Sequence, residues 1–128
     1  MKEAIGTDKA PPAVGPYSQG ICAGNFVFTS GQLPAKPTGE LTSEDIAAAT
    51  HQSLENVRAV LKAASVQMDD VIKVTIFLTD MADFATVNAV YEEFFPGVPP
   101  ARSCVQVAAL PKGAPIEIEA VAHLSQHG

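Results

Sequence analysis

The sequence predicts an α+β fold, in which a mixed β-sheet carries two helices packed on one of its faces. Three observations lead to this prediction. Short runs with period-two alternation occur near both ends of the chain, two amphipathic runs with helical spacing lie between them, and a further alternating run separates those two helices. At 128 residues the chain has the length of one domain, so we expect residues 1–128 to form a single unit.

Two short strands are predicted at 19–23 and 26–30, because two apolar runs flank a Gly-Asn pair that is typical of a hairpin turn. A further strand near residues 3–5 would precede them. The segment 31–42 contains Pro34, Pro37 and Gly39, which indicates a loop.

A helix of about 22 residues follows this loop, as its hydrophobic period indicates. Thr42 or Ser43 is the expected N-cap, with Glu44 and Asp45 favourably placed near the positive end of the helix dipole. The expected buried stripe contains Ile46, Thr50, Leu54, Val57, Leu61 and Ala64.

The second half of the chain predicts a strand at 71–79, a helix from Asp83 to just before Pro96, and two strands at 101–109 and 115–124. In the first of these strands, Ile72, Val74, Ile76 and Leu78 are expected on one face. The second helix carries its apolar stripe at Phe84, Val87, Tyr91 and Phe94. Two helices cover one sheet face, and we expect the other to carry Arg102, Cys104, Glu117, Glu119 and Val121 and to be covered by further subunits.

Composition argues against several classes of protein. The net charge of −6 and pI of about 4.8 disfavour nucleic-acid binding, which needs a basic surface. No apolar run approaches the ~20 residues that span a bilayer, and residues 1–12 lack the apolar core of a signal peptide. Cys22 and Cys104 are therefore expected to be buried thiols rather than a disulfide, in a cytoplasmic protein.

The most informative stretch is 100–120, which places one arginine and two glutamates in apolar, alternating surroundings. Arg102 and Cys104 share one face of their strand, and Glu117 and Glu119 share one face of theirs. A charge in such surroundings needs a partner, and a guanidinium suits a carboxylate because its planar fork donates two parallel hydrogen bonds. A structural ion pair or a wetted sheet face explains the same residues equally well.

The spacing between these residues leaves two arrangements open. If the strands 101–109 and 115–124 formed a symmetric hairpin, Glu117 would lie opposite Ala108, and Arg102 would be six residues or ~20 Å away. A shared site for Arg102 and Glu117 therefore requires either that these strands are not neighbours or that two chains contribute to the site.

Four segments in order carry a family resemblance: GPYSQGI at 15–21, FTSGQLP at 28–34, DFATVNAVYEEFF at 83–95, and PARSCVQVAALPKGAPIEIEA at 100–120. With these segments the chain resembles the Rid family of enamine/imine deaminases, formerly called YjgF or L-PSP. It is most similar to the RidA subgroup of 2-iminobutanoate/2-iminopropanoate deaminases. The resemblance implies a chorismate-mutase-like fold in a homotrimer, with three sites at clefts between subunits.

The resemblance also implies the roles of individual residues toward a small 2-imino acid. Arg102 would bind the substrate carboxylate, Glu117 would position or deprotonate the attacking water, and the backbone at Cys104 would help to hold the ligand. No metal and no organic cofactor is implied. The remaining substrate-binding positions are Tyr17, Ser30, Gly31 and Asn88.

Each of these residues also has a structural explanation. Tyr17 would fill a turn, Ser30 would end a strand, and Asn88 would be an ordinary polar residue of its helix. Glu119 is expected to be structural or to lie at the trimer axis. Cys104 is a poor candidate nucleophile, because no histidine lies near it in the sequence. The three histidines lack metal-ligand spacing and are expected at the surface: His51, His123 and His127.

Two other functions compete with imine hydrolysis. A ribonuclease acting on single-stranded RNA would need a basic strip, which the negative charge disfavours. A noncatalytic trimer would use Arg102 only to capture a small carboxylate or would act as a chaperone. The presence of Arg102 together with Glu117 favours catalysis.

Overall fold

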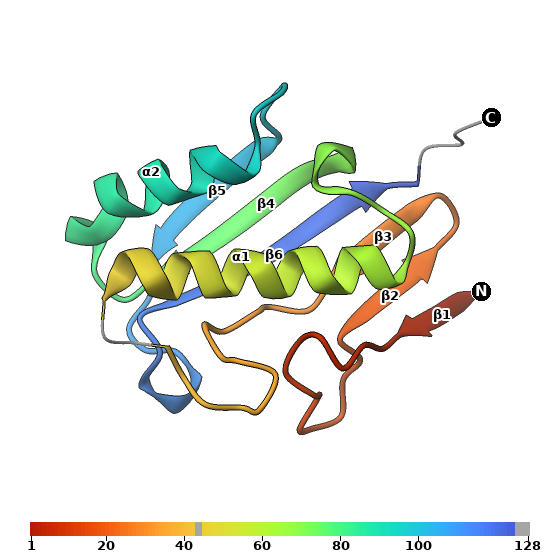
Figure 1. The fold of residues 1–128 in the computed structure, drawn as a ribbon, viewed down its shortest axis with the longest axis horizontal. Coiled ribbons are helices and arrows are strands. Elements are labelled where there is room, and N and C mark those ends of the chain that lie inside the picture. The colour runs from red at the N-terminus through yellow and green to blue at the C-terminus, as the bar shows by residue number, and fades with distance from the viewer. Residues whose placement is uncertain (43–44, 125–128) are drawn as a thin grey trace.

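The computed structural model describes residues 1–42 and 45–124, and these form a six-stranded mixed sheet with both helices on one face (Figure 1). The strand order is β1-β2-β3-β6-β4-β5, in which β4 and β5 are parallel and all other neighbours are antiparallel. The α+β prediction is therefore confirmed. The strands are β1 (Lys2–Ile5), β2 (Gly20–Ala23), β3 (Phe26–Thr29), β4 (Val71–Leu78), β5 (Ala101–Gln106) and β6 (Ile116–His123).

The core lies between the sheet and the helices α1 (Ile46–Ala63) and α2 (Phe84–Phe94). Leu54 of α1 and Ile76 and Ile118 of the central strands are each 0% exposed. Short 3-10 turns span Met68–Asp70, Met81–Asp83 and Pro111–Gly113. None of the described helices is long and apolar enough to cross a membrane.

The N-terminus of α1 differs from the sequence prediction. Asp45 is the N-cap, and its carboxylate accepts hydrogen bonds from the N–H groups of Ala47 at 2.7 Å and Ala48 at 3.2 Å. Thr42 is not the cap, while Ser43 and Glu44 lie outside the described residues. The helix contains 18 residues rather than about 22, because a carboxylate cap begins it later.

The last two strands are not a hairpin, because β4 lies between them. The strand β5 pairs in parallel with one edge of β4, and β6 pairs antiparallel with the other. The chain therefore crosses over the end of β4 between Gln106 and Ile116, and β5 becomes an edge strand of the sheet. The strands β5 and β6 are both shorter than predicted.

The pairing register places Arg102 on the helix-covered face. Val74, which is 1% exposed, lies opposite both Arg102 and Ala120, and opposed residues share a face. The expectation of a common open face is therefore wrong for two of its five members, because alternation within a strand cannot say which sheet face a residue occupies. Arg102 and Cys104 lie on the helix-covered face, whereas Glu117, Glu119 and Val121 lie on the open face.

A β-bulge corrects one more prediction. The pairing of β4 with β6 shifts between Val71, opposite Ala122, and Lys73, opposite Val121. The extra residue is Ile72, which is 44% exposed rather than buried beside Val74.

Both described helices lie on the same face of the sheet (Figure 1), so neither covers the large apolar side chains of the open face. Phe26 and Phe28 of β3 are 40% and 44% exposed, and Val105 of β5 is 42% exposed. Exposed apolar area of this kind is typical of a surface that contacts another molecule.

Candidate active site

Four of the seven predicted site residues line one pocket of ≈ 840 Å³ beside the end of β3. Its walls come from the N-terminal segment, from the loop after β3, and from β6. The predicted residues that line it are Tyr17, Ser30, Gly31 and Glu117, and Glu119 lines it as well.

Gly31 and Glu117 are in close contact, and this contact explains why position 31 has no side chain. A Cβ atom at Gly31 would lie 2.7 Å from the carboxyl carbon of Glu117 and 2.8 Å from its Oε2. The neighbouring Gln32 and Ile118 exchange two backbone hydrogen bonds, of 2.7 and 3.1 Å. The loop after β3 is therefore bound to β6 directly beside the Glu117 carboxyl group.

The structural explanations of Tyr17 and Ser30 hold alongside their place in the pocket. The Tyr17 N–H donates to the Gly15 carbonyl at 2.8 Å, so Tyr17 does sit in a tight turn, yet its side chain is 50% exposed. The Ser30 hydroxyl donates to the Ser18 carbonyl at 2.5 Å, which ties the end of β3 to the segment that carries Tyr17.

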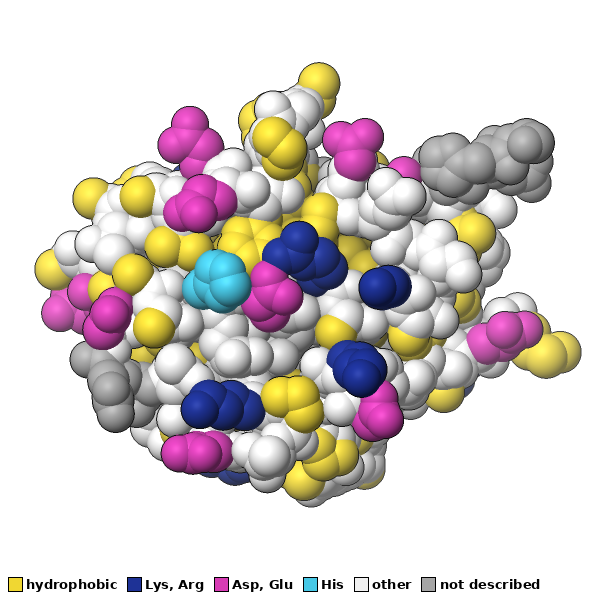
Figure 2. Space-filling model, viewed as in Figure 1, with side chains coloured by type: hydrophobic (Ala, Val, Ile, Leu, Met, Phe, Trp, Pro, Cys, Tyr) yellow, Lys and Arg dark blue, Asp and Glu magenta, His cyan; other side chains and the backbone are white. Residues whose placement is uncertain are grey.

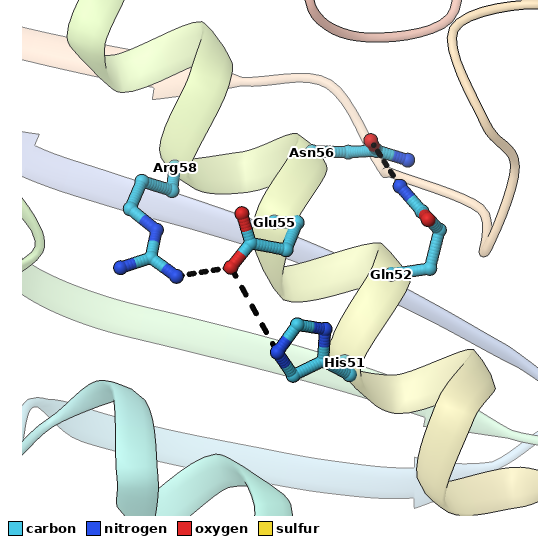
Figure 3. Close-up of polar contacts among 5 residues, drawn as sticks. All are labelled: His51, Gln52, Glu55, Asn56 and Arg58. Carbon is cyan, nitrogen blue, oxygen red and sulfur yellow. Dashed lines mark hydrogen bonds and ion pairs between the residues drawn. The ribbon is translucent and has the colours of Figure 1, made fainter.

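Two buried amide side chains, those of Asn56 and Gln19, hold the pocket walls, and sequence reasoning missed both. Asn56 of α1 is 1% exposed and donates to the carbonyls of Leu33 at 3.1 Å and Ala35 at 2.7 Å. Gln52 in turn donates to the Asn56 Oδ1 at 3.0 Å (Figure 3). An amide beside Val57 in an apolar helical stripe was the signal that could have revealed this anchor.

Gln19 performs the same task for the N-terminal wall. Its Nε2 donates to the carbonyl of Pro11 at 2.8 Å, and its Oε1 accepts from the N–H of Thr7 at 2.7 Å. Because Gln19 is 7% exposed, these bonds are shielded from water and fix the segment against the sheet.

The electrostatics of this pocket favour a proton acceptor at Glu117. Burial of the side chain raises the pKa of Glu117 above its ordinary value, and repulsion from the Glu119 carboxylate raises it further. A carboxylate with a raised pKa is a stronger base than an ordinary glutamate once it is ionised, so it is better suited to take a proton from water.

Arg102 lies in a different environment, against α2. Its Nη1 donates to the Asn88 Oδ1 at 2.7 Å, and its Cζ lies 5.4 Å from the ring centre of Phe84 and 4.9 Å from that of Tyr91. Within the described chain, no carboxylate forms an ion pair with this guanidinium. The structural ion pair, which was the alternative explanation for Arg102, is therefore not formed within the described part of the chain.

Asn88, Arg102 and Tyr91 line a second pocket of ≈ 430 Å³ at the sheet edge. Cys104 lies two residues along β5 on the same face. Burial raises the pKa of the Cys104 thiol, although the charge of Arg102 opposes the rise. The thiol is therefore protonated at neutral pH, which argues against Cys104 as a nucleophile.

The predicted residues thus form two groups rather than one. The Glu117 pocket and the Arg102 pocket have no lining residue in common, and Glu117 and Arg102 occupy opposite faces of the sheet. A third cavity of ≈ 590 Å³ lies between α1 and α2, where Figure 2 shows hydrophobic side chains flanked by basic ones; Arg58, Lys62 and Phe94 line it, and it contains none of the predicted residues.

His51 lies on the exposed side of α1, where it and Arg58 flank Glu55 (Figure 3). His123 packs edge-to-face against Phe26, and His127 is outside the described residues. Across residues 1–42 and 45–124, no group of three or more His, Cys, Asp or Glu residues has the arrangement of a metal site.

Comparison with known proteins identifies the family. The family model described as endoribonuclease L-PSP matches residues 7–124. The chain therefore belongs to this family, which the sequence resemblance had named.

Individual relatives match over almost the whole chain. A curated protein of Salmonella typhimurium, named 2-iminobutanoate/2-iminopropanoate deaminase, is 51% identical over 125 residues, which are 95% of this chain and 98% of that protein. The crystal structure of the Escherichia coli YjgF gene product has a TM-score of 0.92 at 50% identity and covers 96% of this chain and 99% of its own. Escherichia coli TdcF, solved with bound serine, has the same TM-score, identity and coverage.

Proposed function

We propose that this chain hydrolyses reactive 2-imino acids, such as 2-iminobutanoate and 2-iminopropanoate, to 2-oxo acids and ammonia. One structural observation carries the proposal: the half-buried guanidinium of Arg102 is oriented by Asn88 and two rings, yet has no carboxylate partner within the described chain. A fixed and unpaired guanidinium is suited to bind the carboxylate of a small ligand. The names of the relatives support the same activity.

In the proposed reaction, Arg102 binds the substrate carboxylate and Glu117 takes a proton from water. The water oxygen forms a bond to the imine carbon, and the nitrogen takes up a proton as the C=N double bond becomes a single bond. The hydroxyl of this adduct then loses its proton as the C=O bond forms and the C–N bond breaks. The nitrogen, which receives one proton through Glu117 and two in all, leaves as ammonia. One water is consumed and no electrons are transferred, so the chemistry requires neither a metal nor an organic cofactor. Positioning supplies much of the gain, because both reactants are held together.

The remaining predicted residues shape the site in this proposal. Tyr17, Ser30 and Gly31 form the wall beside Glu117, and Asn88 fixes the arginine. Cys104 contributes its backbone groups rather than its thiol, in keeping with the raised pKa of that thiol.

We further propose that the chain forms a homotrimer in which one subunit supplies Arg102 and the next supplies Glu117. Two observations support this. Arg102 and Glu117 lie on opposite faces of one sheet, so a single chain does not bring them together in the described structure. The open face also exposes Phe26, Phe28 and Val105, which an adjoining subunit would cover. Light scattering should give about three times 13.4 kDa, and a stable monomer would contradict the arrangement.

A ribonuclease function is not favoured, although the family description carries that word. With 14 acidic against 8 basic residues, the chain carries a net negative charge, which disfavours the affinity for RNA that depends on a basic surface. Pure carboxylate binding would leave the Glu117 carboxyl group, which lines the first pocket, without a role. We place the activity in the cytoplasm, because Cys22 and Cys104 are both free thiols.

A coupled assay tests the function directly. A pyridoxal-phosphate dehydratase acting on threonine or serine would generate the imine, and the rate of imine loss would be followed with and without this protein. We expect faster conversion to the 2-oxo acid. Unchanged imine loss at micromolar protein would contradict the proposal.

A further inference from the structure

Arg102 is held by one stripe of α2, and one member of that stripe has no role in the account so far. Phe84, Asn88 and Tyr91 follow each other at spacings of four and three, so they share a face of the helix. All three contact the guanidinium of Arg102. The first two surround it with a ring and an amide oxygen, and the third is Tyr91.

Tyr91 is an unusual core residue because of its hydroxyl group. The residue is 6% exposed and belongs to the hydrophobic core, and its phenol oxygen is shielded from solvent. Among the described residues this oxygen has no hydrogen-bond partner. A buried hydroxyl without a partner destabilises a fold, so phenylalanine would serve the core better at this position.

The surroundings of the ring suggest what tyrosine provides instead. The ring centre of Tyr91 lies 4.9 Å from the Arg102 Cζ and 4.6 Å from the ring centre of Phe95. The ring thus packs against Phe95 and presents its face to the cation, within the range of a cation–π interaction.

The donor count of the guanidinium completes the argument. A guanidinium has five N–H donors, and Asn88 is the one side chain that accepts from Arg102 among the described residues. Tyr91 stays neutral, because burial raises its pKa to about 12 despite the opposing charge of Arg102. The oxygen is neutral and has free lone pairs, and its ring lies against a guanidinium with unused donors, so it can accept a hydrogen bond when the guanidinium rotates toward a ligand.

We propose that Tyr91 is a positioning residue for carboxylate recognition. The face of the Tyr91 ring holds the Arg102 guanidinium, and the Tyr91 oxygen accepts a hydrogen bond from a guanidinium N–H when a 2-oxo or 2-imino acid is bound. The inference rests on the proposed function, since it assumes that Arg102 binds the carboxylate. Preorganisation of this kind raises affinity by removing freedom that would otherwise be lost on binding.

Two variants separate the ring from the hydroxyl group, and a third controls for packing. Tyr91→Phe removes only the oxygen, and Tyr91→Leu removes the ring. Phe94→Leu is the matched control, because Phe94 is 7% exposed on the same helix but packs against Arg58 and His51 instead. Calorimetric titration of 2-oxobutanoate gives the Kd of each variant, and thermal unfolding gives its Tm.

We expect Tyr91→Leu to weaken 2-oxobutanoate binding at least tenfold, or about 1.4 kcal/mol. Phe94→Leu should lower Tm about as much as Tyr91→Leu does, but leave Kd unchanged. Tyr91→Phe should weaken binding about threefold and keep or raise Tm, since it removes an unpaired buried hydroxyl. A merely structural tyrosine would not combine these two results. A wild-type Kd in Tyr91→Phe would overturn the proposal that the Tyr91 oxygen accepts a hydrogen bond from Arg102.

Equal Kd values in Tyr91→Leu and Phe94→Leu would overturn the whole inference. Arg102→Ala, titrated beside them, separates this failure from failure of the proposed function. If Arg102→Ala still binds 2-oxobutanoate like the wild type, the carboxylate site itself is wrong and the inference falls with it. If binding is lost in Arg102→Ala but unmoved by both Tyr91 variants, only the inference is wrong.

Discussion

The Glu117 pocket and the Arg102 pocket are built in different ways. Around Glu117, loops are fastened by buried amides, and the carboxyl group sits on a central strand with its pKa raised. Around Arg102, a single helical stripe holds the cation on an edge strand. The first pocket is lined by several segments of the chain, whereas the second presents a charged group at the edge of the sheet. The difference supports the proposal that each chain carries two halves of a site, one for the water and one for the carboxylate.

The largest expected effect is on the Arg102 half. Arg102→Ala should lower kcat/KM about 100-fold or more, because a charge-assisted bidentate pair is worth a few kcal/mol. Arg102→Lys should restore little, since an ammonium cannot reproduce the planar fork. The coupled assay measures both, with circular dichroism to show that the fold is intact. Near wild-type turnover in Arg102→Ala would remove the carboxylate role.

The Glu117 half should respond differently. Glu117→Gln should retain 2-oxobutanoate affinity but lose about 10- to 100-fold in turnover, because glutamine positions a water but cannot accept its proton. Calorimetry beside the coupled assay separates the two quantities. If affinity falls together with turnover, Glu117 instead supports Arg102, and if neither changes, Glu117 leaves the mechanism.

The same variant makes a prediction about stability. A raised pKa in the folded state means that the folded protein binds the Glu117 proton more tightly than the unfolded chain does. The contribution of this group to stability is therefore present below the unfolded pKa and lost as pH rises through the folded value. Thermal unfolding at neutral pH should show Glu117→Gln to be as stable as the wild type or more stable.

Some features of these two halves could be predicted from the sequence and others could not. Alternation and helical spacing predicted the sheet and both helices, and the four family segments supplied the candidate residues of each half. They did not predict that β4 separates β5 from β6, because a strand's own period does not identify its neighbour. The bulge at Ile72 is set by pairing and has no local signal. The anchors Gln19 and Asn56 bond to carbonyls 8 and 21 residues away, so an amide in an apolar run indicates an anchor without identifying its partner.

A smaller effect is expected from the wall beside Glu117. Gly31→Ala would place a methyl group 2.7 Å from the Glu117 carboxyl carbon, so the carboxyl group must move. We expect about a tenfold loss of turnover with little change in 2-oxobutanoate affinity, because only the water half is displaced. Gly6→Ala is the control, since its methyl group would meet Gln19 at an ordinary 3.8 Å. Equal rates in the two variants would contradict the close packing of Glu117.

The smallest expected effect concerns pH. Because Glu117 must be ionised to accept a proton, activity should fall as pH drops through its raised pKa. Glu119→Gln removes one cause of the rise, so the acidic limb of the kcat profile should move to lower pH. An unmoved limb would show that Glu119 does not act on the reacting group.

The claim that two chains complete one site is tested most directly by mixing two inactive variants. Arg102→Ala and Glu117→Gln subunits would be unfolded and refolded together, with each variant refolded alone as the control. If each site takes Arg102 from one subunit and Glu117 from its neighbour, random mixing restores both residues in about a quarter of the sites. The account predicts recovery of about a quarter of wild-type activity in the mixture, whereas a mixture as inactive as its parents would contradict it.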